Sequence, residues 1–357
     1  MININYFCKI IFLFILVIYF VNPGLTKGAP EIQAVNLSLQ SNFKNVATSH
    51  ASSIIVGTSL HPRALNYIIR RGDVSSNQQR YLVTLNIFSG LPNPTYSLTK
   101  SQIDGLKRIL ALSVQNIPKA PPALGYRGYR VLSEDLSESF KVLGNPNAES
   151  YLTNIIQNMI PKSVTYQVRK EIPKVRTANA LVQSALAISA ATYATNNRCN
   201  MTPIRGTHFT PSFDPSSNNF GCFITKQRYN NCYNYSTDIL TNTFAQPGRA
   251  TGISYLRLTC KDVRQAAESD GLVWLGSTYP NFNVAYGHFV ALVIWESNDF
   301  HWLRLDKNGY WSHKPGTSPI INYDNNYNLI SDPASQNLSP YTFCGYLWLN
   351  TSKLNIL

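Results

Sequence analysis

The distribution of cysteines constrains this chain more than any other feature of its sequence. Cys8 lies one residue before Lys9, and the apolar run "IIFLFILVIYF" follows that lysine and is ended by Pro23 and Gly24. This layout is typical of a cleaved secretory signal, so residues 1–28 are predicted to be a signal peptide. The other cysteines all follow residue 195: Cys199, Cys222, Cys232, Cys260 and Cys344. Because secretion exposes them to an oxidising environment, we expect a secreted, extracellular protein with disulfide bonds.

The alternative to cleavage is an uncleaved N-terminal anchor. The apolar run is shorter than the roughly 20 residues that span a bilayer. No later stretch of the sequence is apolar enough to span one. We therefore expect no transmembrane segment once the signal is removed.

The number of cysteines after the signal is odd, which leaves one thiol unpaired or paired with another chain. Four cysteines can pair in three ways, and the sequence does not choose among them. If Cys232 is the odd thiol, the connectivity of the rest stays open: Cys199, Cys222, Cys260 and Cys344. The disulfides then lie only in the C-terminal part.

The charge of the chain indicates its class of partner. The formal net charge is +13 at pH 7. A basic secreted protein favours acidic partners, so we expect acidic glycans, cell-wall polymers or acidic matrix polymers. No nucleic-acid motif is present, and the sequence gives no oligomeric state. Asn-X-Ser/Thr sites predict a glycoprotein, and they stand at Asn36, Asn200, Asn234, Asn337 and Asn350.

Local patterns predict an α+β fold in two domains joined by helices. "RYLVTLNIF" at 80–88 has the composition of a strand. "SLTKSQIDGLKRILALSV" then places apolar residues at helical spacing, with Ser97 or Thr99 as the cap. The predicted parts are an N-terminal α+β domain at 29–146, bridging helices at 147–196 and a disulfide-bonded domain at 197–357.

The bridging part contains "AESYLTNIIQNMI", a helix that Pro161 ends, and an alanine-rich helix at 177–195. An Arg-Gly-Asp tripeptide stands at 71–73. A tripeptide is too short to be specific, so a solvated turn is favoured there over an adhesion site.

A candidate catalytic set lies in the C-terminal domain. Cys232, in "NNCYNYSTD", precedes a short helix whose unpaired N–H groups and dipole stabilise a thiolate. His288 opens "HFVALVIW", which reads as a central strand buried on both faces. A cysteine, a histidine and a polar residue on the next strand form a nucleophile, a base and an orienting group.

The hairpin formed by this strand and the next one selects the third member. If the turn in "ESND" is centred near residue 297 or 298, His288 lies opposite residues 306 to 308. Asp306 or Asn308 is then the candidate that orients the imidazole, depending on a register that a single residue changes. His301 pairs near the turn, about 20 Å from His288, and is a poor third member.

Residues 225 to 310 resemble the papain-like thiol hydrolases of the NlpC and CHAP groups. The resemblance is carried by "NNCYNYSTD" and "GHFVALVI". It implies a helix that bears the cysteine, packed on an antiparallel sheet, and hydrolysis of peptide or cell-wall amide bonds. Cys232 would be the nucleophile and His288 the base of such an amidase or peptidase. The sequence leaves open whether the chain is an enzyme.

A second resemblance points to another class of function. The segments "NCYNYSTD", "FHWLRLDKNGYWSHKPG" and "YTFCGYLWL" are similar to secreted proteins of the insoluble organic matrix of mollusc shells. The similarity extends to "LNIFSGLPNPTYSLT" in the N-terminal part. It implies a non-catalytic structural component that binds acidic polymers, and this is the alternative to the hydrolase.

Structural interpretations stand beside the catalytic ones. Cys232 is equally compatible with a disulfide, and His288 with a hydrogen-bonded core histidine. His313 and Lys314 are predicted to lie in a solvated loop. The histidines at 288, 301 and 313 do not have a usual metal-ligand spacing, so neither a metal site nor a cofactor is predicted.

Overall fold

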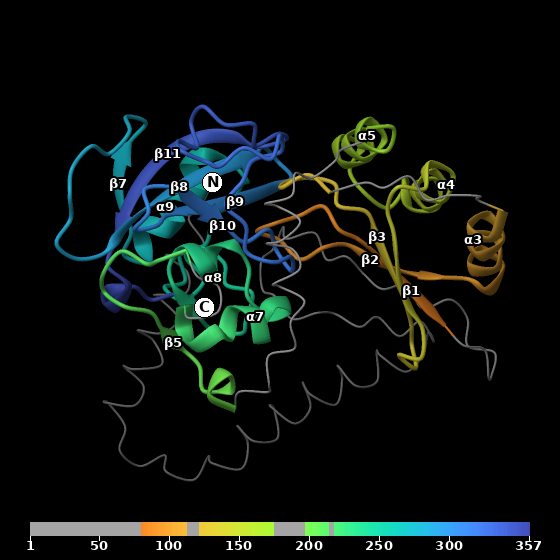
Figure 1. The fold of residues 1–357 in the computed structure, drawn as a ribbon, viewed down its shortest axis with the longest axis horizontal. Coiled ribbons are helices and arrows are strands. Elements are labelled where there is room, and N and C mark those ends of the chain that lie inside the picture. Colours follow the sequence, from red (N-terminus) through yellow and green to blue (C-terminus); the bar gives the residue numbers. More distant parts are fainter. Residues whose placement is uncertain (1–79, 113–120, 175–196, 214–217) are drawn as a thin grey trace, which may run out of the picture. The chain divides into compact units, whose positions relative to one another are not determined.

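A computed structural model of the chain describes residues 80–112, 121–174, 197–213 and 218–357 (Figure 1). All of these residues belong to one compact unit. The structure combines helices with antiparallel sheets, which confirms the predicted α+β class. The larger sheets have the strand orders β2-β1-β3-β4 and β10-β9-β8-β11-β7.

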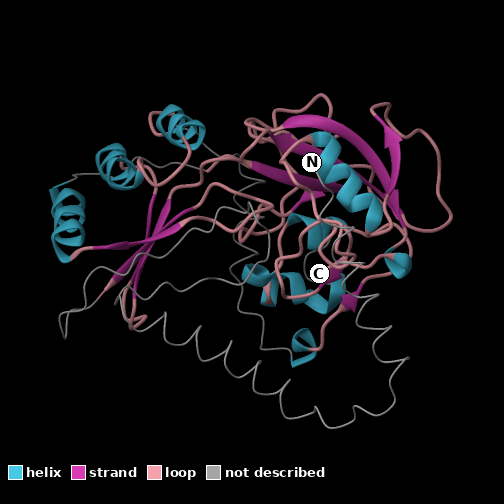
Figure 2. Ribbon diagram, turned by 180° about the vertical axis from the view of Figure 1, so that it is seen from behind, coloured by secondary structure: helices cyan, strands magenta, loops and turns pink. Residues whose placement is uncertain are grey.

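In the described part of the chain, helices cover one face of the first sheet. Its elements are β1 (Tyr81–Leu85), β2 (Thr95–Leu98), β3 (Tyr129–Ser133), β4 (Ser139–Val142) and helices α3 (Lys100–Leu112), α4 (Pro146–Ile156) and α5 (Lys162–Glu171). The helices lie along one side of the sheet (Figures 1 and 2). Strand β1 alternates because Val83 and Leu85 are buried in the core while Leu82 and Thr84 are half-buried on the other face. The face that carries Thr84 is therefore left for other contacts.

The second sheet contains the strands on which the candidate site depends. It is formed by β7 (Val273–Gly276), β8 (His288–Trp295), β9 (Asp299–Leu305), β10 (Trp311–His313) and β11 (Thr342–Leu349). Every residue of β8 is buried, as expected for a central strand. The short helix α8 (Cys232–Ser236) packs on β9, where the rings of Tyr233 and Trp302 have centroids 5.4 Å apart.

The remaining elements of the C-terminal part are short. They are 3-10 turns at Asn197–Asn200, Asn218–Gly221, Gln227–Tyr229 and Thr351–Lys353, strands β5 (Ile204–Arg205) and β6 (Ile239–Leu240), and helices α7 (Cys222–Thr225) and α9 (Cys260–Ser269). Among the described residues, no helix is long and apolar enough to cross a membrane.

Several local predictions agree with the structure. The strand predicted at 80–88 is β1, and the helix that follows is α3, whose first turn is capped by Thr99. The Thr99 hydroxyl accepts from the Gln102 N–H at 3.2 Å, and the Gln102 side chain accepts from the Thr99 N–H at 2.9 Å. The helix predicted before Pro161 is α4.

Other predictions lie outside the described residues. These are the signal peptide, the Arg-Gly-Asp tripeptide and the alanine-rich helix at 177–195. The domain boundaries at residues 146 and 197 stay a prediction.

The two larger sheets are linked by the carboxylate of Asp299, at the start of β9. It accepts hydrogen bonds from the N–H groups of Ser89 at 2.5 Å and Leu91 at 2.9 Å, and the Gly90 N–H also points to it. The hydroxyl of Tyr341 donates to it at 2.5 Å. The loop after β1 is therefore held by a buried acceptor that belongs to the second sheet.

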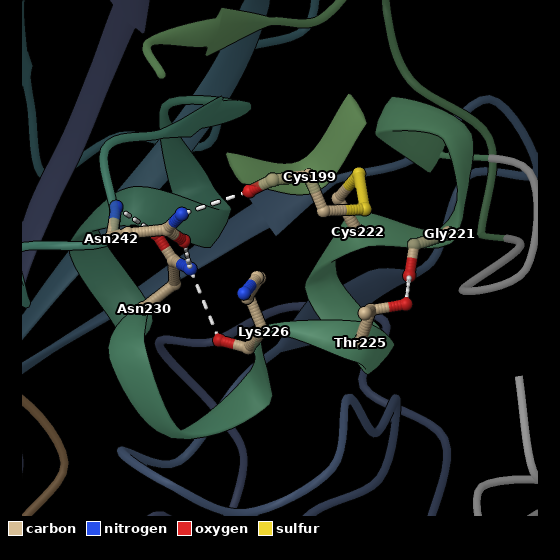
Figure 3. The surroundings of a disulfide bond; sticks show 7 residues. All are labelled: Cys199, Gly221, Cys222, Thr225, Lys226, Asn230 and Asn242. Atoms are coloured by element: carbon tan, nitrogen blue, oxygen red, sulfur yellow. Dashed lines mark hydrogen bonds between the residues drawn. A yellow bond between two sulfur atoms is a disulfide. The ribbon is translucent and has the colours of Figure 1, made fainter. Parts of the chain in front are cut away.

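Two disulfides join segments of the C-terminal part. Cys199 is bonded to Cys222, and Cys260 to Cys344. Figure 3 shows that the first disulfide lies beside a small amide network, in which the Asn242 side chain donates to the Cys199 carbonyl at 2.9 Å. Cys232 is the free cysteine among the described residues, which agrees with the odd number of thiols.

The two disulfides differ in the length of chain that they close, 23 residues for Cys199–Cys222 and 84 for Cys260–Cys344. A longer closed loop restricts the unfolded chain more. We expect replacement of the Cys260–Cys344 pair by serines to lower the free energy of unfolding by about 2–5 kcal/mol. The loss should exceed that for the Cys199–Cys222 pair by roughly 1 kcal/mol. Denaturant unfolding of both double variants measures this difference, and equal losses would contradict it.

Candidate functional site

The predicted nucleophile, Cys232, is the first residue of α8. Asn231 precedes it as the N-cap, and its side-chain oxygen accepts from the N–H groups of Tyr233 at 3.0 Å and Asn234 at 3.2 Å. The Asn234 side chain accepts in turn from the Asn231 N–H at 3.2 Å. The run of asparagines around Cys232 therefore forms a reciprocal cap, in which Asn residues take both side-chain roles.

The environment of the Cys232 sulfur disfavours a thiolate. The residue is fully buried. Burial raises the pKa of its thiol well above the usual value, and the negative charge of Asp299 raises it further. The backbone N–H of Trp302 and the positive charge of Lys314 lower the thiol pKa, but they do not outweigh these effects. The helix start is present as predicted, but desolvation outweighs its stabilisation of the anion.

The predicted base, His288, contacts the other end of the same helix. Its Nε2 lies 2.6 Å from the carbonyl oxygen of Ser236, the last residue of α8, and therefore donates to it. Four residues of helix separate Ser236 from Cys232, a rise of about 6 Å. Burial lowers the pKa of His288 to about 3, so its ring is neutral. Among the described residues, no hydrogen bond joins His288 to Cys232.

The two candidate orienting groups have other partners. The register of β8 and β9, in which Val290 faces Arg304, continues to place residue 306 opposite residue 288. The Asp306 carboxylate nevertheless accepts from the Arg304 side chain at 3.0 Å. Asn308 lies in the exposed turn that follows, and its side chain accepts from the Tyr310 N–H at 3.1 Å. The predicted hairpin is confirmed. Asp306 accepts from the Arg304 side chain, and Asn308 accepts a hydrogen bond within the turn.

Arg304 is the centre of a buried ion group. Its guanidinium also reaches Asp238 at 3.1 Å, so that one cation faces two carboxylates. Burial raises the pKa of both aspartates, and the charge of Arg304 lowers it again. The guanidinium lies over the ring of Tyr235 at 3.9 Å. This group fixes the region after α8 to β9.

A chain of histidines was missed by the sequence argument. His301 Nε2 lies 2.9 Å from His313 Nδ1, and His313 Nε2 lies 3.0 Å from the Tyr323 carbonyl. Because a carbonyl only accepts, His313 donates through Nε2, accepts through Nδ1 and so receives the proton of His301 Nε2. His301 Nδ1 is then an acceptor without a partner. The spacing of alternate residues on adjacent antiparallel strands is the signal that would have paired these rings.

The prediction of a solvated loop at His313 and Lys314 is wrong. His313 belongs to β10, and both residues are fully buried. The ammonium group of Lys314 donates to the carbonyls of Gln227 at 2.6 Å, Asn230 at 2.5 Å and Gly316 at 2.6 Å. Burial lowers the pKa of Lys314 to about 7. Three carbonyls satisfy its donors, which is why the polar sequence "SHKPG" can enter the interior.

Asn234 is also unavailable, although it begins a glycosylation sequence. Its side-chain nitrogen donates to the Ile239 carbonyl at 3.0 Å and to the Thr241 hydroxyl at 2.8 Å. Because the residue is fully buried, a glycan on this nitrogen is incompatible with the folded structure. Within the described ranges, no group of three His, Cys, Asp or Glu side chains is arranged to hold a metal ion.

A sequence comparison supplies the family. The chain is 45% identical over 122 residues to "Insoluble matrix shell protein 1" of Ruditapes philippinarum, and the match covers 34% of this chain and 80% of that protein. The chain belongs to this family. No protein-family model matches the chain, and no solved structure matches it. The resemblance to shell matrix proteins is thus supported by the comparison, while the resemblance to NlpC and CHAP hydrolases is not.

The burial of Cys232 predicts how its thiol reacts. In the folded protein at pH 8, alkylation by iodoacetamide should be slower than for a free cysteine by about a hundredfold or more, because the anion is destabilised and shielded. His288→Ala should not slow it further, since His288 contacts Ser236 and not the sulfur. Mass spectrometry of native and urea-unfolded samples gives both rates. Fast alkylation of native Cys232 that His288→Ala abolishes would restore the predicted catalytic pair.

The buried histidines predict a loss of stability in acid. Burial lowers the pKa of His313 to about 4 in the folded chain, against 6.5 for an ordinary histidine. The stabilisation from its neutral ring is complete above pH 6.5 and is lost as the pH falls through 4. The difference in unfolding free energy between wild type and His313→Gln should therefore shrink by roughly 3 kcal/mol between these pH values.

Chemical unfolding at several pH values measures this change. His208→Gln is the matched control, because His208 is exposed. The comparison with a variant is needed because Asp299 and Asp270 act oppositely. Burial raises the pKa of each to about 6, so both contribute stability that grows as the pH falls. A pH-independent difference for His313→Gln would show that His313 is not neutral when folded.

Proposed function

We propose that the chain is an extracellular structural component of a shell organic matrix and binds acidic polymers without turnover. The observation that carries the proposal is the 45% identity to the insoluble matrix shell protein over most of the length of that protein. The two disulfides fit such a location, because disulfides persist in oxidising, extracellular surroundings.

The arrangement of the interior supports a structural role. The Cys232 thiol and the His288 ring are buried and neutral, and the Nε2 of His288 is bonded to the Ser236 carbonyl. A thiol hydrolase needs an exposed thiolate within reach of its base. No observation on the described residues favours that chemistry, so the NlpC-like or CHAP-like activity stays an untested prediction of the sequence.

The charge of the surface supports acidic partners. The chain has 31 lysines and arginines against 18 aspartates and glutamates. Exposed cations are distributed over several elements of the described part: Lys162, Arg169, Lys170, Arg228, Lys261, Lys307 and Lys353. Dispersed cations of this kind attract anionic polymers through their summed field. Partners of this class are acidic glycans and acidic matrix or cell-wall polymers.

Retention on an anionic matrix tests this function. The secreted, folded chain should bind immobilised sulfated polysaccharide at low salt and elute below about 0.5 M NaCl, because exposed charges are screened over roughly 8–10 Å at physiological ionic strength. A neutral polysaccharide of the same backbone is the control. Retention that is indifferent to salt would contradict an electrostatic mode of binding.

A second measurement addresses location and turnover. Antibodies against the chain should label the insoluble organic fraction of decalcified shell from the organism that makes it. The purified chain should release no product from amide substrates or peptidoglycan peptides, and Cys232→Ala should behave as wild type. Turnover that Cys232→Ala removes would replace the structural proposal by the hydrolase.

A further inference from the structure

A pocket of about 500 Å³ opens beside the first sheet. Its lining comes from the segment between Pro121 and Arg127, from β3 and β4, and from the loop between Pro315 and Tyr323 that follows β10. This volume lies in the range of small-ligand sites. The pocket uses the face of the sheet that the helices α3, α4 and α5 leave uncovered.

The pocket is lined by cations and contains no carboxylate. Arg127, Arg130 and Lys141 contribute to it, and none of its described lining residues is Asp or Glu. Burial lowers the pKa of Arg130, and the positive charge of a fourth cation, Arg228, lowers it further.

Two carboxylates outside the lining act on these cations through their charge. Glu149 raises the pKa of Lys141, against the larger lowering by burial and by Arg127. Asp299 raises the pKa of Arg127, against the larger lowering by burial. The oxygens of Asp299 are occupied by backbone donors and Tyr341, so this carboxylate forms no ion pair with the pocket.

Arg127 is a buried lining residue of this pocket, and no carboxylate of the described residues is bonded to it. Only 5% of the residue is exposed. Its terminal nitrogens donate to the carbonyls of Gly125 at 2.9 Å and Phe88 at 2.8 Å, and its Nε has no partner. A buried guanidinium with an unused donor is unfavourable unless an acceptor completes it. Arg127 is therefore a buried cation beside the pocket whose donors the protein satisfies only in part.

A second observation, independent of Arg127, points to the same ligand. Arg130 and Lys141 face each other directly across β3 and β4. Like charges at directly opposite positions of a sheet repel each other and destabilise the strand pair. Among the described residues, the Arg130 guanidinium donates to the Ser139 hydroxyl alone, at 3.4 Å. A bound anion between the two side chains would convert this repulsion into attraction.

The remaining walls suit a ring. Pro121, Pro315, Pro319 and the aromatic residue Tyr323 contribute apolar surface beside the cations. A sugar ring that carries an acidic substituent matches this arrangement, because its C–H faces are apolar and its substituent is charged. An acidic peptide would instead present a flexible chain whose backbone groups require their own partners.

We propose that this pocket binds an acidic sugar unit, with Arg127, Arg130 and Lys141 around its sulfate or carboxylate and the proline and aromatic walls against its ring. The proposal deepens the acidic-polymer binding proposed above and rests on it, because it gives one part of a charged surface a defined ligand. Guanidinium groups are well suited to this task, since they bind sulfate and carboxylate through paired N–H donors.

Calorimetric titration of the full secreted chain tests the pocket. The probes are N-acetylglucosamine 6-sulfate and glucuronic acid, with N-acetylglucosamine, inorganic sulfate and an oligo-aspartate peptide as comparisons. At least one acidic sugar should bind at a single saturable site, and more tightly than the neutral sugar, the free anion or the peptide. Sulfate binding as tight as that of the sulfated sugar, or tighter binding of the peptide, would overturn the assignment.

Charge-matched variants separate the pocket from the dispersed surface charge. The double variant Arg130→Gln/Lys141→Gln should weaken sugar binding by about tenfold or more, as expected when charge-assisted hydrogen bonds are lost. Lys261→Gln/Lys353→Gln removes the same charge from exposed positions outside the pocket and should leave Kd within about twofold of the wild-type value. The pocket variant should also keep or raise its melting temperature, because the facing cations no longer repel.

The outcomes distinguish the two proposals. Equal weakening by both double variants would overturn the pocket and leave the general electrostatic binding in place. Loss of saturable sugar binding in wild type, with salt-sensitive retention on the polymer intact, would do the same. Retention that fails on the polymer as well would overturn the proposed function itself.

Discussion

The carboxylate of Asp299 fixes the relation between the two sheets. Because β9 begins at this residue, its oxygens meet the backbone N–H groups of the loop at Ser89 to Leu91. The same loop offers its Gly90 carbonyl to the side chains of Asn231 at 2.9 Å and Gln246 at 3.0 Å. The cap of α8, the start of β9 and the exit of β1 thus meet at one buried position, and the pocket beside Arg127 depends on this junction.

The same interaction contributes to the electrostatics of the candidate site. Burial is the main cause that raises the pKa of the Cys232 thiol, and the charge of Asp299 at this junction raises it further. Two buried cations are also bonded within the protein. Lys314 donates to three carbonyls, and Arg304 pairs with two carboxylates. Satisfied buried polar groups specify one arrangement of the chain. The Nε2 of His288 is also bonded within the fold, to the Ser236 carbonyl.

The local structure could be predicted well from the sequence, because local rules decide it. The alternation of β1, the cap at Thr99 and the hairpin register near Ser297 follow from residues close together in the chain. Counting thiols predicted one unpaired cysteine, and among the described residues the structure identifies it as Cys232. The pairing of the other cysteines could not be predicted, because it depends on which distant segments the fold brings together.

The candidate site was harder to predict, because it depends on burial and on which end of α8 each strand meets. Cys232 starts a helix and His288 starts a strand, as expected, yet the imidazole reaches Ser236. Cys232 lies at the start of α8 and His288 contacts its end. The sequence does not show which end of the helix the histidine meets.

Charge is distributed unequally between the interior and the surface, and this difference bears on function. Inside, Arg304 and Lys314 are matched by acceptors of the protein itself. Arg127 is buried with one donor unused, and it lies where the uncovered sheet face brings Arg130 and Lys141 together. Arg130 is half-buried and Lys141 is exposed, and in the described part of the chain none of the three is bonded to a carboxylate. The anion proposed for this pocket would offset their mutual repulsion, so its binding would also stabilise the fold.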